Sequence, residues 1–333
     1  MTMSFKDIVG NEQIKKILKL SLRENRLPGS LLFAGPPGVG KTATALTVAK
    51  ALNCQNLRDE ACDRCHSCQL VDRGQHPNVR FITREKNREQ IVKDQVDEIN
   101  YLARLRPWQG GRLVFIIDQA ERMNETAANS LLKTLEEPGG SVYFILITED
   151  LSAILPTIRS RCQVLKFKRI SQEDLERALE ARGLPPDRAG LVASTTDGNL
   201  ELALNLSWEE FIAGRNRAWM IFTNLLGKGE DEDFLNLVSG GARKDSLDSF
   251  KETLSFFSVF FRDLLAARKG QAASLLNSDL KSELESLARK VPEDRATEGV
   301  KHMEDYLRSL KKNPNLGIIS NEIVIFFRNI NYV

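Results

Sequence analysis

The 333-residue sequence lacks three features that would place it in a special class of protein. Its longest apolar runs, such as VYFILI at 142–147, are far too short to cross a bilayer. Its first residues, MTMSFKDIVGNEQ, contain no apolar stretch of the kind that a secretory signal requires. Neither sign of charge is in excess, because 47 Lys and Arg stand against 45 Asp and Glu and the net charge is +2. We therefore expect a cytoplasmic globular protein, without a bulk charge that would mark nucleic acid as its partner.

Cysteine is scarce, and its five residues are unevenly spread. Four of them lie within fifteen residues, in the pattern C-x7-C-x2-C-x2-C: Cys54, Cys62, Cys65 and Cys68. In a reducing compartment this clustering favours a metal over disulfides, and four thiolates around a tetrahedral Zn²⁺ leave no open position for catalysis. We predict a structural zinc that stabilises an insertion at 54–68. Four free thiols, or His66 or His76 in place of one cysteine, are the alternatives, and Cys162 is expected to be buried elsewhere.

Hydrophobic patterning divides the chain into an α/β half and an all-helical half. Five short apolar runs alternate with helical patterns: SLLFAG (30–35), VRFIT (79–83), LVFIID (113–118), VYFILIT (142–148) and QVLKFK (163–168). Strands that alternate with helices predict a parallel sheet flanked by helices, and ligands of such sheets bind at the carboxyl ends of the strands. Gly35 and Asp118 both stand at such ends.

The strand pattern stops after Lys168. ISQEDLERALEARGLPP then predicts a helix with Ser171 as N-cap and Gly183 as its stop. We expect an α/β domain over 1–168, a small helical domain over 169–207 and a bundle of long helices over 208–333. An apolar stripe along 247–265 in that bundle favours a packed core over a partner surface.

The segment GPPGVGKT fits the phosphate-loop pattern G-x-x-x-x-G-K-[ST], after a strand and before a helix that begins near Lys41. Its residues are Gly35, Pro36, Pro37, Gly38, Val39, Gly40, Lys41 and Thr42. The glycines let backbone N–H groups point at phosphate oxygens, while Lys41 would reach the β and γ phosphates and Thr42 would bind Mg²⁺. Asp118 would hold the Mg²⁺ through water. We predict a site for ATP or ADP with Mg²⁺, the alternative being a glycine-rich turn without a ligand.

Hydrolysis of ATP needs a base, and in this kind of fold the residue after the strand-end Asp usually supplies it. Gln119 stands there, and an amide cannot accept a proton. Glu121 follows two residues later and is interpreted as a solvated charge. The chain's own ATPase activity is therefore expected to be weak or absent.

Several segments together resemble the bacterial clamp-loader branch of the AAA+ family, over essentially the whole chain. They are FKDIVGNEQ, GPPGVGKT, the four-cysteine insertion, IIDQAERMNETAANSLLKTLEEP, IRSRC and KKNPNLGIISNEIVIFFR. The resemblance implies an AAA+ domain over 1–168, a helical lid over 169–207 and a collar over 208–333 that joins a five-subunit ring. Such rings belong to the DNA polymerase III holoenzyme and place the sliding clamp on primed DNA.

The clamp-loader branch contains gamma/tau subunits, which hydrolyse ATP, and a second kind of subunit that acts as a stator. Gln119 departs from the gamma/tau pattern, and Glu201 in DGNLELAL stands where a sensor arginine is typical. Thr148 and Glu149 both remain candidates for a further sensor position. Arg161 in IRSRC is retained, and the resemblance implies that this arginine acts in trans on a neighbour's ATP.

The resemblance therefore favours the stator kind of subunit, which completes the ring. Its implied partners are gamma/tau and delta subunits, the sliding clamp and, through the assembled complex, primed DNA. An active gamma/tau-type ATPase is the first alternative, and a non-replicative AAA+ remodeller is the second.

Overall fold

The computed structural model describes residues 4–57, 59–85, 88–227, 229, 231–239, 243–271, 274–310 and 315–330. The chain divides into two compact units. The first comprises Met1–Ala178 with Gly198–Glu201, and the second comprises Leu179–Asp197 with Leu202–Val333. The domain boundaries expected at 168 and 207 remain predictions. Among the described helices, none is long and apolar enough to span a membrane.

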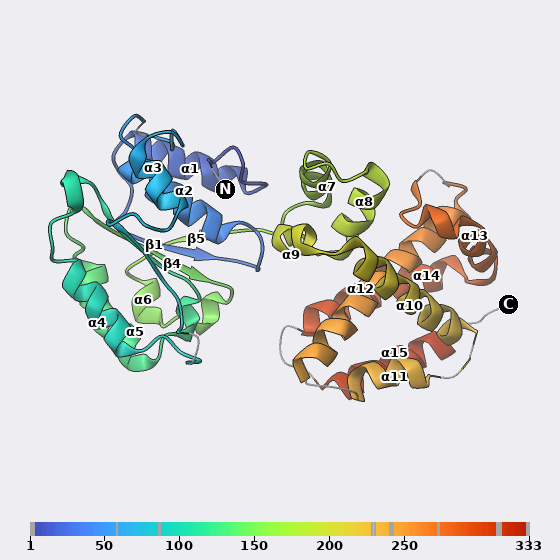
Figure 1. The fold of residues 1–333 in the computed structure, drawn as a ribbon. Helices are drawn as coiled ribbons and strands as arrows, with labels where there is room; N and C mark the ends of the chain where they lie inside the picture. The colour runs from blue at the N-terminus through green and yellow to red at the C-terminus, as the bar shows by residue number, and fades with distance from the viewer. Residues whose placement is uncertain are drawn as a thin grey trace. The chain divides into compact units, whose positions relative to one another are not determined.

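A five-stranded parallel sheet forms the centre of the first unit (Figure 1). In the order β2-β3-β4-β1-β5, its strands are Val79–Ile82, Leu113–Ile117, Val142–Thr148, Ser30–Ala34 and Gln163–Lys166. The five predicted strands are confirmed, with ends that differ by at most two residues. β1, β3 and β4 are buried along their whole length, which is typical of parallel strands covered on both faces.

Helices cover the two faces of this sheet (Figure 1). The helices of the first unit are α1 Glu12–Arg23, α2 Lys41–Asn53, α3 His66–Asp72, α4 Lys93–Leu102, α5 Glu125–Glu136 and α6 Pro156–Arg159. Successive strand side chains point to opposite faces, so Leu31 and Phe33 pack with the α1 and α2 side while Leu32 packs with the α4 and α5 side. The apolar runs of the sequence are thus split between two cores.

Helix α7, Gln172–Glu180, follows the sheet as predicted. The Ser171 hydroxyl accepts a hydrogen bond from the Asp174 backbone N–H at 3.1 Å, which confirms the N-cap. Gly183 has a φ of 93°, a left-handed conformation that suits glycine at the end of a helix.

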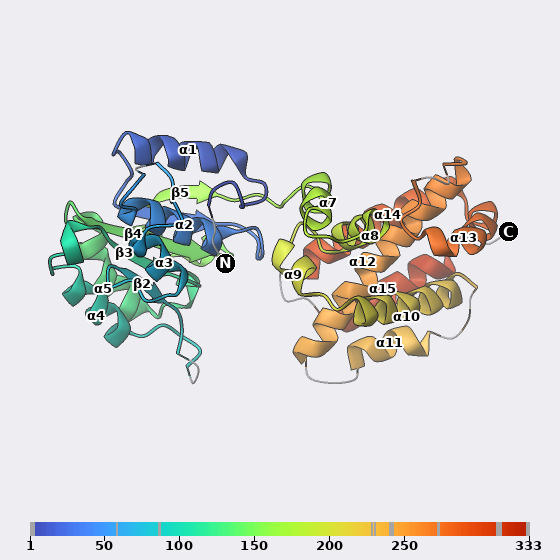
Figure 2. The ribbon, with the colours of Figure 1, turned by 45° about the horizontal axis from the view of Figure 1, so that its top comes forward.

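The second unit is all helical (Figure 2). Its helices are α8 Pro186–Thr195, α10 Trp208–Leu226, α11 Glu232–Ser239, α12 Arg243–Arg268, α13 Lys281–Lys290, α14 Glu293–Ser309 and α15 Leu316–Arg328, while α7 and α9, Leu200–Asn205, both begin in the first unit. α12 packs against α8, α10, α11, α13 and α14. Within the predicted stripe, Phe250, Leu254, Phe257 and Phe261 are completely buried, which confirms the core interpretation.

The predicted fold class, a parallel α/β domain followed by an all-α region, is confirmed.

Candidate functional site

The phosphate-loop segment connects β1 to α2 at the carboxyl edge of the sheet. Gly38 and Gly40 have φ values of 67° and 88°, a left-handed conformation in which a side chain would be strained. Gly40 is the N-cap of α2, so the unpaired N–H groups of the first helical turn face the loop. The predicted residues from Gly35 to Thr42 therefore form the strand, loop and helix start that an anion-binding loop requires.

The side chain of Lys41, the first residue of α2, points back toward the phosphate loop that precedes it. This side chain is almost wholly buried, and Nζ donates to the carbonyl oxygens of Gly35 at 2.6 Å and Pro36 at 2.5 Å. Burial lowers the pKa of Lys41, and neighbouring carboxylates act against that shift. The ammonium group thus lies where the backbone of the loop curls around it.

Four carboxylates act electrostatically on Lys41: Glu149, Asp118, Glu121 and Glu201, in decreasing order. The sheet order explains how distant residues meet, because β4 lies between β1 and β3 and the carboxyl ends of all three reach the same edge. Asp118 follows β3 directly. Burial raises its pKa, and the nearby charge of Glu121 adds to this shift. The site thus carries more negative than positive side-chain charge before any ligand is considered.

Gln119 and Glu121 occupy the turn after β3. Gln119 has a φ of 53° and starts the short 3-10 helix Ala120–Arg122. Glu121 is half-buried, and its Oε2 is a buried atom for which the described residues provide no hydrogen-bond partner. The interpretation of Glu121 as a solvated charge is therefore wrong, because this tight turn keeps the carboxylate close enough to Lys41 and Asp118 to act on both.

A second segment lies directly on the phosphate loop. A side chain at Gly38 would begin 1.6 Å from Asn199 Oδ1, and the Leu200 N–H donates to the Gly38 carbonyl oxygen at 3.1 Å. Asp197 and Gly198 make this approach with φ values of 52° and 74°. The Asp-Gly pair of the sequence signals this turn but not its contact with the phosphate loop. The turn also explains why Glu201 acts on Lys41.

The two sensor candidates differ in their surroundings. Thr148 is buried at the end of β4, and its hydroxyl donates to the Asp150 carbonyl at 3.0 Å while accepting from the Asp150 N–H at 3.2 Å. Glu149 is exposed and is the carboxylate that acts most strongly on Lys41. Of these two residues, Glu149 contributes charge to the surroundings of Lys41, while the Thr148 hydroxyl is bonded to the backbone of Asp150.

The four clustered cysteines converge as predicted. Their sulfur atoms all lie within 4.8 Å of one another. Cys54 is the C-cap of α2, Cys65 is the N-cap of α3, and Cys68 lies in the first turn of α3. A tetrahedral site with Zn–S bonds of about 2.3 Å needs sulfurs about 3.8 Å apart, so this group can hold a metal ion.

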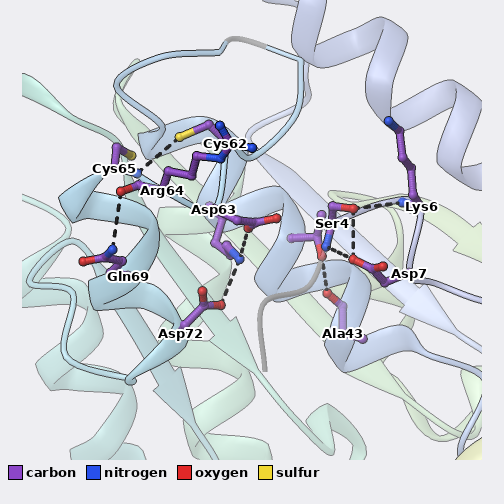
Figure 3. A network of polar contacts seen from close by, with 12 residues as sticks. Ser4, Lys6, Asp7, Ala43, Cys62, Asp63, Arg64, Cys65, Gln69 and Asp72 are labelled. Carbon is purple, nitrogen blue, oxygen red and sulfur yellow. Dashed lines mark hydrogen bonds and ion pairs between the residues drawn. The ribbon is translucent and has the colours of Figure 1, made fainter. Parts of the chain in front are cut away.

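Backbone N–H groups support the thiols. The Leu57 N–H donates to Cys54 Sγ at 3.3 Å, and the Cys65 N–H donates to Cys62 Sγ at 3.4 Å. Figure 3 shows Cys62 and Cys65 on the turn that leads into α3. Bonds of this kind stabilise the thiolate form that a metal requires.

Neither histidine considered as an alternative ligand belongs to the cysteine group. His66 is exposed, whereas His76 is buried and bonded within the fold. Its Nε2 lies 2.9 Å from Ser67 Oγ, and its Nδ1 accepts from the Asn78 N–H at 3.1 Å. Cys162 is buried elsewhere, as predicted, and burial raises its pKa to about 12.

Arg161 follows α6 and is held against the end of α5. Its Nε and Nη2 donate to Glu136 Oε2 at 3.2 and 3.1 Å, and its Nη1 donates to the Thr157 carbonyl at 3.1 Å. The side chain is 30% exposed. The two motifs LLKTLEEP and SRC are therefore in contact through Glu136 and Arg161. The action of Arg161 on a neighbouring subunit remains a prediction.

A phosphate loop after β1 in a parallel sheet covered by helices defines the chain as a P-loop protein. Two family models match it: "DNA polymerase III, delta subunit" at residues 10–171 and "DNA polymerase III, delta subunit, C terminal" at residues 220–324. The chain therefore belongs to the DNA polymerase III delta-subunit family, which confirms the resemblance found in its motifs.

Two curated relatives show where the similarity lies. The chain is 27% identical to DNA polymerase III subunit delta' of Bacillus subtilis (strain 168) over 338 residues, 98% of this chain and 99% of the relative. It is 35% identical to subunit tau of the same organism over 209 residues, which cover 61% of this chain but only 37% of tau. Among solved structures, a gamma subunit-related protein of Thermotoga maritima aligns with 96% of this chain and 99% of its own at 18% identity and a TM-score of 0.37.

Proposed function

We propose that this chain is a delta'-type subunit of the DNA polymerase III clamp loader and acts mainly as a stator. In this proposal it completes a ring with gamma/tau and delta subunits, and the ring loads a sliding clamp onto primed DNA. Support comes from the alignment with a delta' subunit, which extends over nearly the full length of both chains.

The observation that carries the stator role is the charge around Lys41. Asp118, Glu121, Glu149 and Glu201 all act on it, and Gln119 fills the position after the strand-end Asp. A γ-phosphate would add negative charge where carboxylates already lie, and nothing at residue 119 can take the proton of an attacking water. ATP or ADP with Mg²⁺ is proposed as a bound ligand that this subunit turns over slowly or not at all.

Lys41, Thr42 and Asp118 are the residues proposed to hold such a nucleotide. Lys41 would exchange its two carbonyl partners for phosphate oxygens, while Thr42 and Asp118 would hold Mg²⁺. The N–H groups from Gly38 to Thr42 would bind phosphate at the start of α2.

Arg161 is proposed to act in trans. Its guanidinium is oriented by Glu136 while 30% of the side chain stays exposed, so it is accessible from outside the chain. An arginine supplied to a neighbouring nucleotide stabilises charge on the transferred phosphoryl group, with effects of about 10³ to 10⁵ on rate in related enzymes.

The four cysteines are proposed to hold a structural Zn²⁺. When bound, the ion would supply four bonds that fix the insertion at 54–68, which has only a small core of its own around Ala61, Cys65 and Cys68. Four sulfur ligands would fill a tetrahedral ion, so no catalytic role is proposed for it.

The test is the DNA- and clamp-stimulated ATPase rate of a reconstituted loader altered in this subunit alone. Arg161→Ala should lower turnover markedly, whereas Lys41→Ala should barely change it. Arg159→Ala is the matched control, because Arg159 is an exposed arginine at the end of α6, two residues before Arg161. All three loaders must first assemble. A large loss with Lys41→Ala and none with Arg161→Ala would overturn the stator proposal.

A gamma/tau-type ATPase is the second candidate, and the position of Glu121 favours it. This half-buried carboxylate acts on both Lys41 and Asp118, so it is the group that could replace the missing base. Glu121→Gln would then abolish turnover that depends on Lys41, and the stator proposal expects no such turnover to lose.

A further inference from the structure

Lys50 is a buried cation next to the cysteine group. Its side chain on α2 is 1% exposed, and Nζ forms ion pairs with Asp63 and, at 2.8 Å, with Asp72 Oδ1. Figure 3 shows the two carboxylates directed at one nitrogen atom, Asp63 from the turn that bears Cys62 and Cys65, and Asp72 from α3. A buried ammonium group is unfavourable unless it is paired, so the two carboxylates stabilise Lys50 in this buried position.

Each member of this ion-pair triad, Lys50, Asp63 and Asp72, is close in sequence to one of the thiols. Helical residues four positions apart lie on the same face, which applies to Cys68 and Asp72 on α3. Cys54, four residues after Lys50, is the C-cap of α2. The spacings are Lys50 to Cys54, Cys68 to Asp72, and Cys62 to its neighbour Asp63. Each triad member therefore lies within four residues of a thiol, at the end of α2, on the turn and on α3.

Asp63 adds a constraint on the turn. Its φ of 56° is left-handed, a conformation that residues other than glycine adopt uncommonly. Asp63 lies between Cys62 and Cys65, whose sulfurs must point the same way to share an ion. The ion pair with Lys50 holds this turn against α2, which is itself fixed in the core through Ala45, Val48 and Ala49.

We infer that Lys50 is a positioning residue for the four-cysteine metal site. Its pairs with Asp63 and Asp72 hold α2, the turn and α3 so that the four thiols converge, and its positive charge offsets part of the negative charge of a divalent ion bound by four thiolates. Residues that orient metal ligands in this way typically affect metal affinity by about 10- to 100-fold. The inference rests on the proposed binding of Zn²⁺ and concerns this chain's own residues.

The test measures the affinity of the full chain for Zn²⁺ and Co²⁺ by competition with a chromophoric chelator. Lys50→Met keeps most of the length of the side chain and removes its charge, and it should weaken binding by about 10-fold or more. It should also change the Co²⁺ ligand-field absorption, which reports the geometry of the sulfur ligands. Lys19→Met is the matched control, because Lys19 pairs with Glu60 of the same insertion at 3.1 Å but is partly exposed and should change affinity less than about twofold.

Asp63→Asn is a second variant that tests the inference even if Lys50→Met does not fold, since it breaks one ion pair and leaves Lys50 paired with Asp72. Asp63→Asn should also weaken metal binding. Where both single variants fold, the double variant should lose less affinity than the sum of the two single losses, because each single change already breaks the pair between Lys50 and Asp63. A folded Lys50→Met or Asp63→Asn chain with unchanged affinity and an unchanged Co²⁺ spectrum overturns the inference alone. An unaltered chain that binds neither ion overturns the zinc proposal as well.

Discussion

Asn199 Oδ1 lies 1.6 Å from the point where a side chain on Gly38 would begin. The two residues are 161 positions apart, and the adjacent hydrogen bond from the Leu200 N–H to the Gly38 carbonyl fixes the contact. Asn199 and Leu200 therefore cover one side of the phosphate loop. The loop can keep its shape only if residue 38 has no side chain.

Gly38→Ala should accordingly abolish nucleotide binding and destabilise the first unit. The added methyl group would displace the Asn199 turn, and the left-handed backbone adds a strain of about 1 to 2 kcal/mol. Gly74→Ala is the matched control, because Gly74 has nearly the same φ, 66°, and open space around it. It should lose stability through strain alone and leave nucleotide binding intact. Calorimetric titration with ADP and chemical denaturation measure the two effects, and equal nucleotide affinity in both variants would contradict this account.

Gly299→Ala should loosen the helical unit. A methyl group on this α14 residue would meet the Phe261 ring of α12 at 2.7 Å, and Phe261 is completely buried, so the ring has no free space to move into. Overpacking of this kind costs about 1 to 3 kcal/mol. The midpoint of urea unfolding should fall by a corresponding amount, while Glu298→Ala on the exposed face of the same helix should change it little. An unchanged midpoint would show that α12 and α14 can separate freely.

Removal of metal should change the number of reactive thiols. After treatment with a strong chelator at pH 8, the half-buried thiols of Cys54 and Cys62 should react quickly with a disulfide reagent, because the ion would no longer protect them, whereas Cys65 and Cys68 are buried and should react more slowly. Cys162 should react only on unfolding, since it is buried and its pKa is raised to about 12. Counting fast thiols with and without chelator checks this, and Cys162→Ala should leave the fast count unchanged. Fast reaction of Cys162 before unfolding would be the contrary result.

The stability of the helical unit should depend on the charge of Asp279. Its carboxylate accepts from Arg215 Nη1 at 2.8 Å and Nη2 at 2.7 Å, and this hydrogen bonding lowers its pKa. A carboxyl whose pKa is lower in the folded than in the unfolded chain stabilises the folded state fully at pH values above its unfolded-state pKa of about 4. This contribution is lost as the pH falls through the pKa that the carboxyl has in the folded chain. Asp279→Asn should therefore destabilise the chain at pH 7 but much less at pH 3.

Unfolding of Asp279→Asn at both pH values is the measurement, with Asp305→Asn as control, because Asp305 pairs with an arginine that is 70% exposed. The buried Asp263 acts in the opposite sense, since burial raises its pKa. An equal loss at pH 7 and pH 3 would mean that the Arg215 pair does not contribute.

Much of the first unit could be predicted because its pattern is local. Each strand is a short apolar run, and the phosphate loop and the cysteine group are continuous motifs whose spacing reflects their geometry. The burial of Glu121 could not be predicted, because the sequence shows that Glu121 is three residues after Asp118 but not how the turn after β3 directs its side chain. The pairing of Lys50 could not be predicted, because a lysine near the end of a helix has the same local sequence whether it is solvated or paired in the interior.

The sequence by itself determined which residues are candidates for binding phosphate and metal, since glycine, lysine and thiol chemistry require only neighbours close in the chain. It also determined the absence of an acid after Asp118. Only the tertiary structure decided which distant charges meet, because the sheet order brings the ends of β1, β3 and β4 to one edge. The surroundings of Lys41, the support of Arg161 by Glu136 and the pairing of Lys50 all depend on contacts between segments that no local pattern records.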